Sequence, residues 1–104
     1  VLGDEKLNAA AQQRAVEIAT VTSHTRPDGT SCFTVLDDFN VTDEATGENA
    51  AWGQVTPEEV VNDWMNSEGH RANILNPDAH KMGFGYYSDN SSEWCRQWIQ
   101  IFTE

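Results

Sequence analysis

The pair of side chains best placed for chemistry lies in the segment Ser-Glu-Gly-His-Arg at residues 67–71. Glu68 offers a carboxylate and His70 an imidazole, and both groups can move protons or bind a metal ion. On a continuous helix, residues two positions apart point about 200° away from each other and cannot share a target. If Gly69 unwinds the chain, both side chains can turn toward one cleft. The alternative is that they decorate a helix end, where His70 would favour the negative end of the helix dipole.

The remaining reactive residues give weaker signals. His80 lies in a polar segment and is predicted to be a solvated surface histidine. Cys32 and Cys95 are compatible with one disulfide, which could contribute up to about 4 kcal/mol, or with two separate buried thiols. Neither cysteine has a histidine close in sequence, so a cysteine nucleophile is not expected. The sequence also lacks the short motifs of zinc peptidases, serine hydrolases and phosphate-binding loops.

The first half of the chain predicts a helix followed by a turn. Apolar residues recur at spacings of three and four over residues 4–21, which predicts a helix with one narrow apolar stripe and Arg14 lying off it. The sequence Arg-Pro-Asp-Gly at residues 26–29 is a strong turn signal. His24 is therefore expected at the junction of the helix and the turn, held by structure on both sides.

The second half predicts another helix and a hairpin. Residues 56–69 open with a capping box and carry an apolar face, so they predict a helix that ends at Gly69. The other expected elements are a short helix or strand over residues 33–39, an acidic loop over 37–47, a strand over 47–53 that contains Glu48, a turn-rich stretch over 70–77, a strand over 82–87, a polar turn over 89–92 and a strand from 94 or 96 to 103. The last two strands are expected to pair as an antiparallel hairpin. This order of elements favours an α+β fold around an antiparallel sheet.

Composition narrows the choice of partners. Seventeen acidic and six basic residues give a net charge of −11, and this field repels nucleic acid and anionic membranes, so neither is an expected partner. No run of about 18 apolar residues occurs, so no transmembrane segment is predicted. The 104 residues, 38% of them hydrophobic, are enough for one domain with a core.

Several segments resemble the successive signatures of the CAP superfamily, which includes the cysteine-rich secretory, antigen-5 and plant pathogenesis-related 1 proteins. They are Ser-His-Thr-Arg-Pro-Asp-Gly at 23–29, Gly-Glu-Asn-Ala-Ala at 47–51, the stretch from Val-Val-Asn-Asp-Trp to Ile-Leu-Asn-Pro at 60–77, Met-Gly-Phe-Gly at 82–85 and Trp-Ile-Gln-Ile-Phe at 98–102. The residues of these segments are most similar to those of bacterial members. The resemblance implies one CAP (SCP-like) domain over residues 1–104, an α-β-α sandwich with a central, mainly antiparallel sheet. The first helix of the family domain is expected to be missing, so that the domain is N-terminally incomplete.

The resemblance also implies a cleft formed by His24, Glu48, Glu68 and His70. In the family, the two histidines can hold a divalent ion, often zinc, so His24 and His70 are the implied ligands of a weakly held ion. The expected function is a secreted module that binds an unknown extracellular protein, peptide or lipid.

Three alternatives remain open for the same four residues. The first is a metal-dependent hydrolase in which Glu48 or Glu68 takes a proton from a metal-bound water. The second is a lipid or sterol carrier. The third is that the four side chains mainly cross-link helix, strand and loop by hydrogen bonds.

Overall fold

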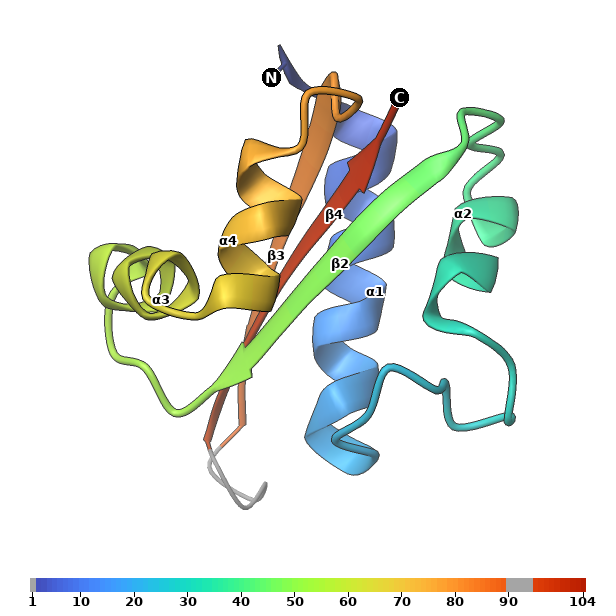
Figure 1. Ribbon diagram of the computed structural model, residues 1–104. Helices are drawn as coiled ribbons and strands as arrows, with labels where there is room; N and C mark the ends of the chain where they lie inside the picture. The colour runs from blue at the N-terminus through green and yellow to red at the C-terminus, as the bar shows by residue number, and fades with distance from the viewer. Residues whose placement is uncertain (1, 90–94) are drawn as a thin grey trace.

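The computed structural model describes residues 2–89 and 95–104. Its helices precede the final pair of strands in the chain (Figure 1). They are β1 (Leu2–Gly3), α1 (Glu5–Thr20), the 3-10 helix η1 (Cys32–Thr34), α2 (Val35–Asp38), β2 (Ala45–Trp52), α3 (Pro57–Met65), α4 (Glu68–Leu75), β3 (Lys81–Ser88) and β4 (Arg96–Thr103). The predicted α+β class is therefore confirmed.

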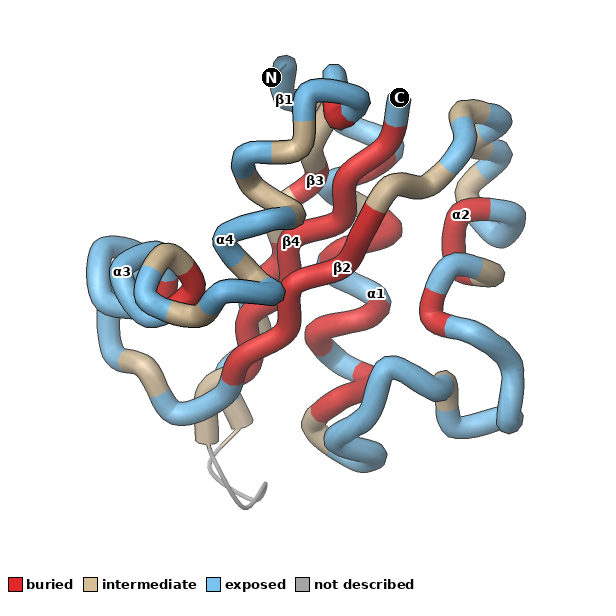
Figure 2. The backbone as a smooth tube through the Cα atoms, viewed as in Figure 1, coloured by how far each residue is buried: buried red, intermediate tan, exposed pale blue. Residues whose placement is uncertain are grey.

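The strands form one sheet in the order β1-β3-β4-β2. β4 lies in the middle and pairs antiparallel with both β3 and β2, whereas the two-residue β1 pairs parallel with β3. The predicted hairpin of β3 and β4 is confirmed; its expected polar turn falls largely on residues 90–92, which lie outside the described ranges. β4 is buried along nearly its whole length (Figure 2). β2 is left with one free edge, and this edge carries the candidate site.

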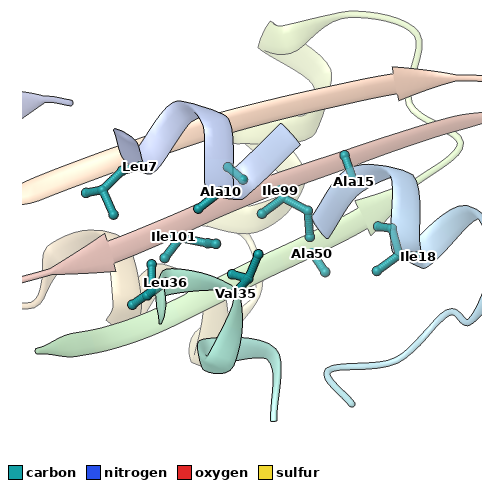
Figure 3. Close-up of a cluster of buried hydrophobic side chains, with 10 residues drawn as sticks. Leu7, Ala10, Ala15, Ile18, Val35, Leu36, Ala50, Ile99 and Ile101 are labelled. Carbon is teal, nitrogen blue, oxygen red and sulfur yellow. The ribbon is translucent and has the colours of Figure 1, made fainter. Parts of the chain in front are cut away.

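Helices cover both faces of the sheet, so the chain forms an α-β-α sandwich (Figure 1). Successive strand residues point to opposite faces, and β2 shows this directly. Ala50 packs with Ile99 and Ile101 in the cluster beneath α1 and α2 (Figure 3). The next residue, Ala51, belongs to a second cluster beneath α3 and α4. Glu48 therefore faces the α1 layer, and its neighbours in sequence face the α4 layer.

Small residues allow α1 to lie directly against β3. The helix presents alanines that are fully buried, at positions 10, 11 and 15. Opposite them stand Gly83 and Gly85, where an added Cβ would collide with the backbone of Leu7 and of Ala11 respectively. The close approach fixes the position of α1, and α1 in turn supplies Arg14 to the site.

The predicted start of α3 is confirmed, but its predicted end is wrong. Thr56 accepts a hydrogen bond from the backbone N–H of Glu59, as a capping residue should. The helix stops at Met65, and a separate helix, α4, begins at Glu68. Gly69 lies inside α4 and does not have the positive φ of a helix-ending glycine. A glycine costs a helix only about 1 kcal/mol, so the packing of α4 against β2 and α3 overrides the local signal.

Three further expectations are settled by the structure. The stretch from residue 70 is helical to Leu75, so the expected turn-rich segment is wrong over most of its length. The short element near residue 33 is helical and not a strand, since η1 and α2 run through Asp38. The acidic loop is shorter than expected because β2 already begins at Ala45.

Among the described residues, no helix is both long enough and apolar enough to cross a bilayer.

Candidate functional site

The site is centred on a contact between His24 and Glu48 at the free edge of β2. The Nδ1 atom of His24 lies 2.7 Å from the Oε1 atom of Glu48. The Glu48 side chain is 1% exposed, whereas the His24 side chain is 60% exposed. The pair therefore joins the protein core to an imidazole that solvent and ligands can reach.

Arg14 holds Glu48 from inside the molecule. Its Nε donates to Oε2 of Glu48 at 2.9 Å, and its Nη2 donates to Oε1 at 3.2 Å. The same guanidinium donates to the backbone carbonyl of Ser23 at 2.7 Å and pairs with Glu17 at 3.0 Å. Arg14 is fully buried, so its expected place off the buried stripe of the helix is wrong. Because it contacts both Glu48 and the residue before His24, it fixes the two members of the pair relative to each other.

These contacts shift the pKa values of the pair in opposite directions. Hydrogen bonds with Cys32 and then Glu48 raise the pKa of His24 to about 10, outweighing its partial burial. Burial opposes ionisation of Glu48, but hydrogen bonds with His24 and Arg14 outweigh it and hold the pKa of that carboxyl below its usual value. Glu48 is thus a stably ionised acceptor that orients His24.

Cys32 lies beside this pair, although no pattern in the sequence predicts that position. An antiparallel bridge between Thr25 and Ser31 folds the chain back on itself, and the Cys32 N–H donates to the His24 carbonyl at 2.9 Å. One donor atom from each of His24, Cys32 and Glu48 lies within 4.8 Å of the others, so the three could hold a metal ion. Cys32 follows His24 by eight positions in the chain, and only the reversal of the chain brings them together.

The two cysteines do not form a disulfide, so of the two alternatives the separate thiols are observed. Cys32 is buried and Cys95 is partly exposed. Cys32 is therefore a single thiol within reach of an imidazole and a carboxylate.

His70 approaches the same edge from the other face of the sheet. It lies in the first turns of α4, and its backbone carbonyl accepts a hydrogen bond from the Asn49 side chain at 3.1 Å. Burial and then the charge on His24 lower the pKa of His70. The two imidazoles therefore interact electrostatically. Within the described residues, the group of close donor atoms does not include His70.

Glu68 is placed differently from the other three predicted site residues. It is the exposed first residue of α4. Among the described residues, no hydrogen bond or ion pair is found for its carboxylate. With Gly69 helical, Glu68 and His70 point about 200° apart. The structure therefore brings His24 and Glu48 into contact and His70 near them, whereas a place for Glu68 in the cleft remains a prediction.

A groove of about 350 Å³ runs from His70 along the end of β2. Its lining combines aromatic, small and polar side chains: Ala50, Ala51, Trp52, Gln54, Asp63, Trp64, Ser67 and His70. Such a surface can accept a ligand with both apolar and hydrogen-bonding groups. His80, by contrast, lies in an exposed loop, in agreement with its predicted role as a surface residue.

Comparisons with known proteins agree with this fold. Residues 3–102 match the family described as CAP, the cysteine-rich secretory protein family. The chain belongs to this family. It is 42% identical over 98 residues to the uncharacterized protein YkwD of Bacillus subtilis (strain 168), covering 92% of this chain and 38% of that protein.

Solved structures show the same fold. An extracellular protein containing an SCP domain, from Bacillus anthracis str. Ames, superposes with a TM-score of 0.86 at 24% identity, over 100% of this chain and 33% of that one. An outer surface protein from Borrelia burgdorferi superposes with a TM-score of 0.84 at 23% identity, over 100% of this chain and 77% of that one. The chain thus spans little more than a third of YkwD and a third of the Bacillus anthracis protein.

Proposed function

We propose that the chain is a secreted, extracellular binding module whose cleft at the edge of β2 weakly holds a divalent ion, best suited to zinc. The observation that carries this proposal is the orientation of His24 by Glu48 across 2.7 Å. Metal-binding histidines usually donate their second ring nitrogen to a carboxylate, which fixes the ring and makes it a better ligand. With Nδ1 engaged by Glu48, Nε2 of His24 can bind an ion, which displaces the proton that the ring carries there at neutral pH.

His70 is the proposed second ligand because it approaches the same edge from α4. Its lowered pKa keeps the ring neutral at neutral pH, which is the form that binds metal. Two protein nitrogens leave other positions for water or for a group of the ligand, and such a site is weaker than a structural zinc site with four protein ligands.

The groove beside His70 is the proposed seat of the ligand. Trp52, which is 36% exposed, offers an aromatic surface, and Gln54 and Asp63 offer hydrogen bonds. An extended peptide or the polar end of a lipid from an extracellular partner has this mixture of groups. An extracellular location is supported by the relatives described as extracellular and as an outer surface protein.

A binding role is favoured over hydrolysis by the state of Glu48. Arg14 pairs with this carboxylate inside the core, and the pKa of Glu48 is held low. A general base for a metal-bound water works best with a pKa near the working pH, so Glu48 is poorly matched to that role.

Calorimetric titration with zinc tests the proposal. The wild type should bind zinc, His24→Ala should abolish the binding, and His70→Ala should weaken it by about tenfold or more, since a tenfold loss corresponds to only about 1.4 kcal/mol. His80→Ala is the matched control, because His80 is an exposed histidine outside the cleft. Equal binding by the wild type and His24→Ala would overturn the proposal.

A further inference from the structure

The thiol of Cys32 is a buried reactive group that the proposed function does not use. It is 4% exposed, yet it lies against an imidazole and a carboxylate and not only against apolar atoms. We propose that Cys32, His24 and Glu48 form a mixed sulfur, nitrogen and oxygen site for a thiophilic divalent ion. The proposal rests on the proposed function to the extent that both place an ion on His24, but it assigns a different set of ligands and a narrower class of metal.

The spacing of the three donor atoms suits one ion. Zinc bonds of roughly 2.0–2.3 Å in a tetrahedral site hold neighbouring ligand atoms about 3.3–3.8 Å apart. The donor atoms of the three residues all lie within 4.8 Å of one another. Shifts of about 1 Å, which side-chain rotation supplies, bring them to bonding distance of a common centre.

The backbone that carries these ligands is held in place without the ion. The bridge between Thr25 and Ser31 and the Cys32 N–H to His24 carbonyl bond fix the two loop ligands side by side. Ser31 accepts from the N–H of Phe33, which caps η1 at the residue before Cys32. A prearranged set of ligands loses little conformational freedom when the ion binds.

Glu48 can bind this ion through one carboxylate oxygen while the other oxygen remains paired with Arg14. Its Oε2 accepts from Nε of Arg14 at 2.9 Å, the shorter of the two Arg14 contacts. Its Oε1 faces His24 at 2.7 Å, and an ion would take the place of the proton shared there. The charged His24 ring thus gives up its Nδ1 proton and keeps the one on Nε2. The thiol proton of Cys32 also leaves, so two protons are released for each divalent ion bound and the charge of the buried cluster is conserved.

The sulfur ligand decides which ions the site prefers. Thiolate and imidazole suit zinc, cobalt and cadmium, whereas magnesium and calcium require oxygen ligands. Three protein ligands leave one position open, which is the arrangement of zinc sites that bind an exogenous group. The mostly exposed His24 places that open position on the solvent side of the cluster.

Cobalt spectroscopy tests the proposal, because a thiolate bound to Co²⁺ gives a charge-transfer band in the near ultraviolet that nitrogen and oxygen ligands do not give. The reduced wild-type protein should develop this band on titration with Co²⁺ and lose it on addition of Zn²⁺. Cys32→Ser and His24→Ala should abolish the band. Cys95→Ser is the matched control, since it removes the only other thiol and should leave the spectrum unchanged.

The wild-type spectrum alone can overturn the proposal, even if Cys32→Ser fails to fold. Absence of the charge-transfer band, or its persistence in folded Cys32→Ser, would do so. The outcome is separable from that of the proposed function. Zinc binding that depends on His70 without a thiolate band would leave the proposed function standing and remove the site of Cys32. A thiolate band that His70→Ala does not alter would support the site of Cys32 and remove His70 as a ligand.

Discussion

The carboxylate of Glu48 lies 2.7 Å from the imidazole of His24 and connects the interior of the sandwich to its surface. The buried end of this connection is the ion pair between Glu48 and Arg14, and the exposed end is a candidate metal ligand. Substitutions in the core and at the surface should therefore affect each other.

Glu48→Gln should destabilise the protein by about 3 kcal/mol. The substitution leaves the fully buried Arg14 without its main counter-ion, and breaking a buried pair typically costs about 3–5 kcal/mol. The loss should fall at the lower end of that range because Arg14 keeps Glu17 and the Ser23 carbonyl. The free energy of unfolding from urea titration measures it. As a control, Asp43→Asn breaks the half-exposed pair with Lys81 and should have little effect; similar losses for both variants would contradict the prediction.

The stability contributed by His24 should decline as pH rises. The folded protein, through Cys32 and then Glu48, raises the pKa of His24 from 6.5 to about 10. A raised pKa means that the folded state retains the proton more strongly. The stability that protonated His24 contributes is therefore complete below pH 6.5 and is lost as the pH rises to about 10. Urea unfolding of the wild type and His24→Gln across this range measures the effect. The difference between the two should shrink with rising pH, and a constant or growing difference would show that the sign is wrong.

His24→Ala should raise the pKa of His70. Burial is the larger cause of its lowered pKa and the charge on His24 is the smaller one. Removing the charge therefore leaves the pKa of His70 still below its usual value but closer to it. Titration of the His70 ring by NMR measures this directly. Glu68→Gln is the informative companion: no change in the His70 pKa is expected if Glu68 points away along α4, and a fall would show that its carboxylate faces the cleft.

Gly83→Ala should destabilise the protein by about 3 kcal/mol or more. The added methyl group would collide with the backbone of Leu7, which cannot move unless α1 shifts. Gly69→Ala is the opposite case, since beyond its sequence neighbours and the adjacent backbone of α4 no atom lies within 4 Å of its Cβ position. That substitution should stabilise the protein by about 0.5–1 kcal/mol because alanine is the better helix former. Thermal unfolding of the two variants tests the contrast, and a destabilised Gly69→Ala would show that Gly69 has a role beyond helix formation.

Local patterns in the sequence were sufficient to predict most of the helices and strands. Helical spacing predicted α1, the capping residues predicted the start of α3, and two strand-like segments on either side of a polar turn predicted β3 and β4. Each of these signals acts between residues close in the chain, so no knowledge of tertiary packing is needed to interpret it. The resemblance to CAP domains then identified the class of protein and placed His24 and Glu48 in one cleft.

The chemistry around that contact depended on tertiary structure. Arg14 lies on the buried face of its helix, and only its placement beside Glu48 makes burial of its charge favourable. Gly69 is a helix-ending signal that packing overrides, and this separates Glu68 from His70 in direction. Cys32 meets His24 because a single bridge reverses the loop between them. Pairing across a chain reversal leaves no periodic trace in the sequence, which is why the place of Cys32 in the site emerged only with the fold.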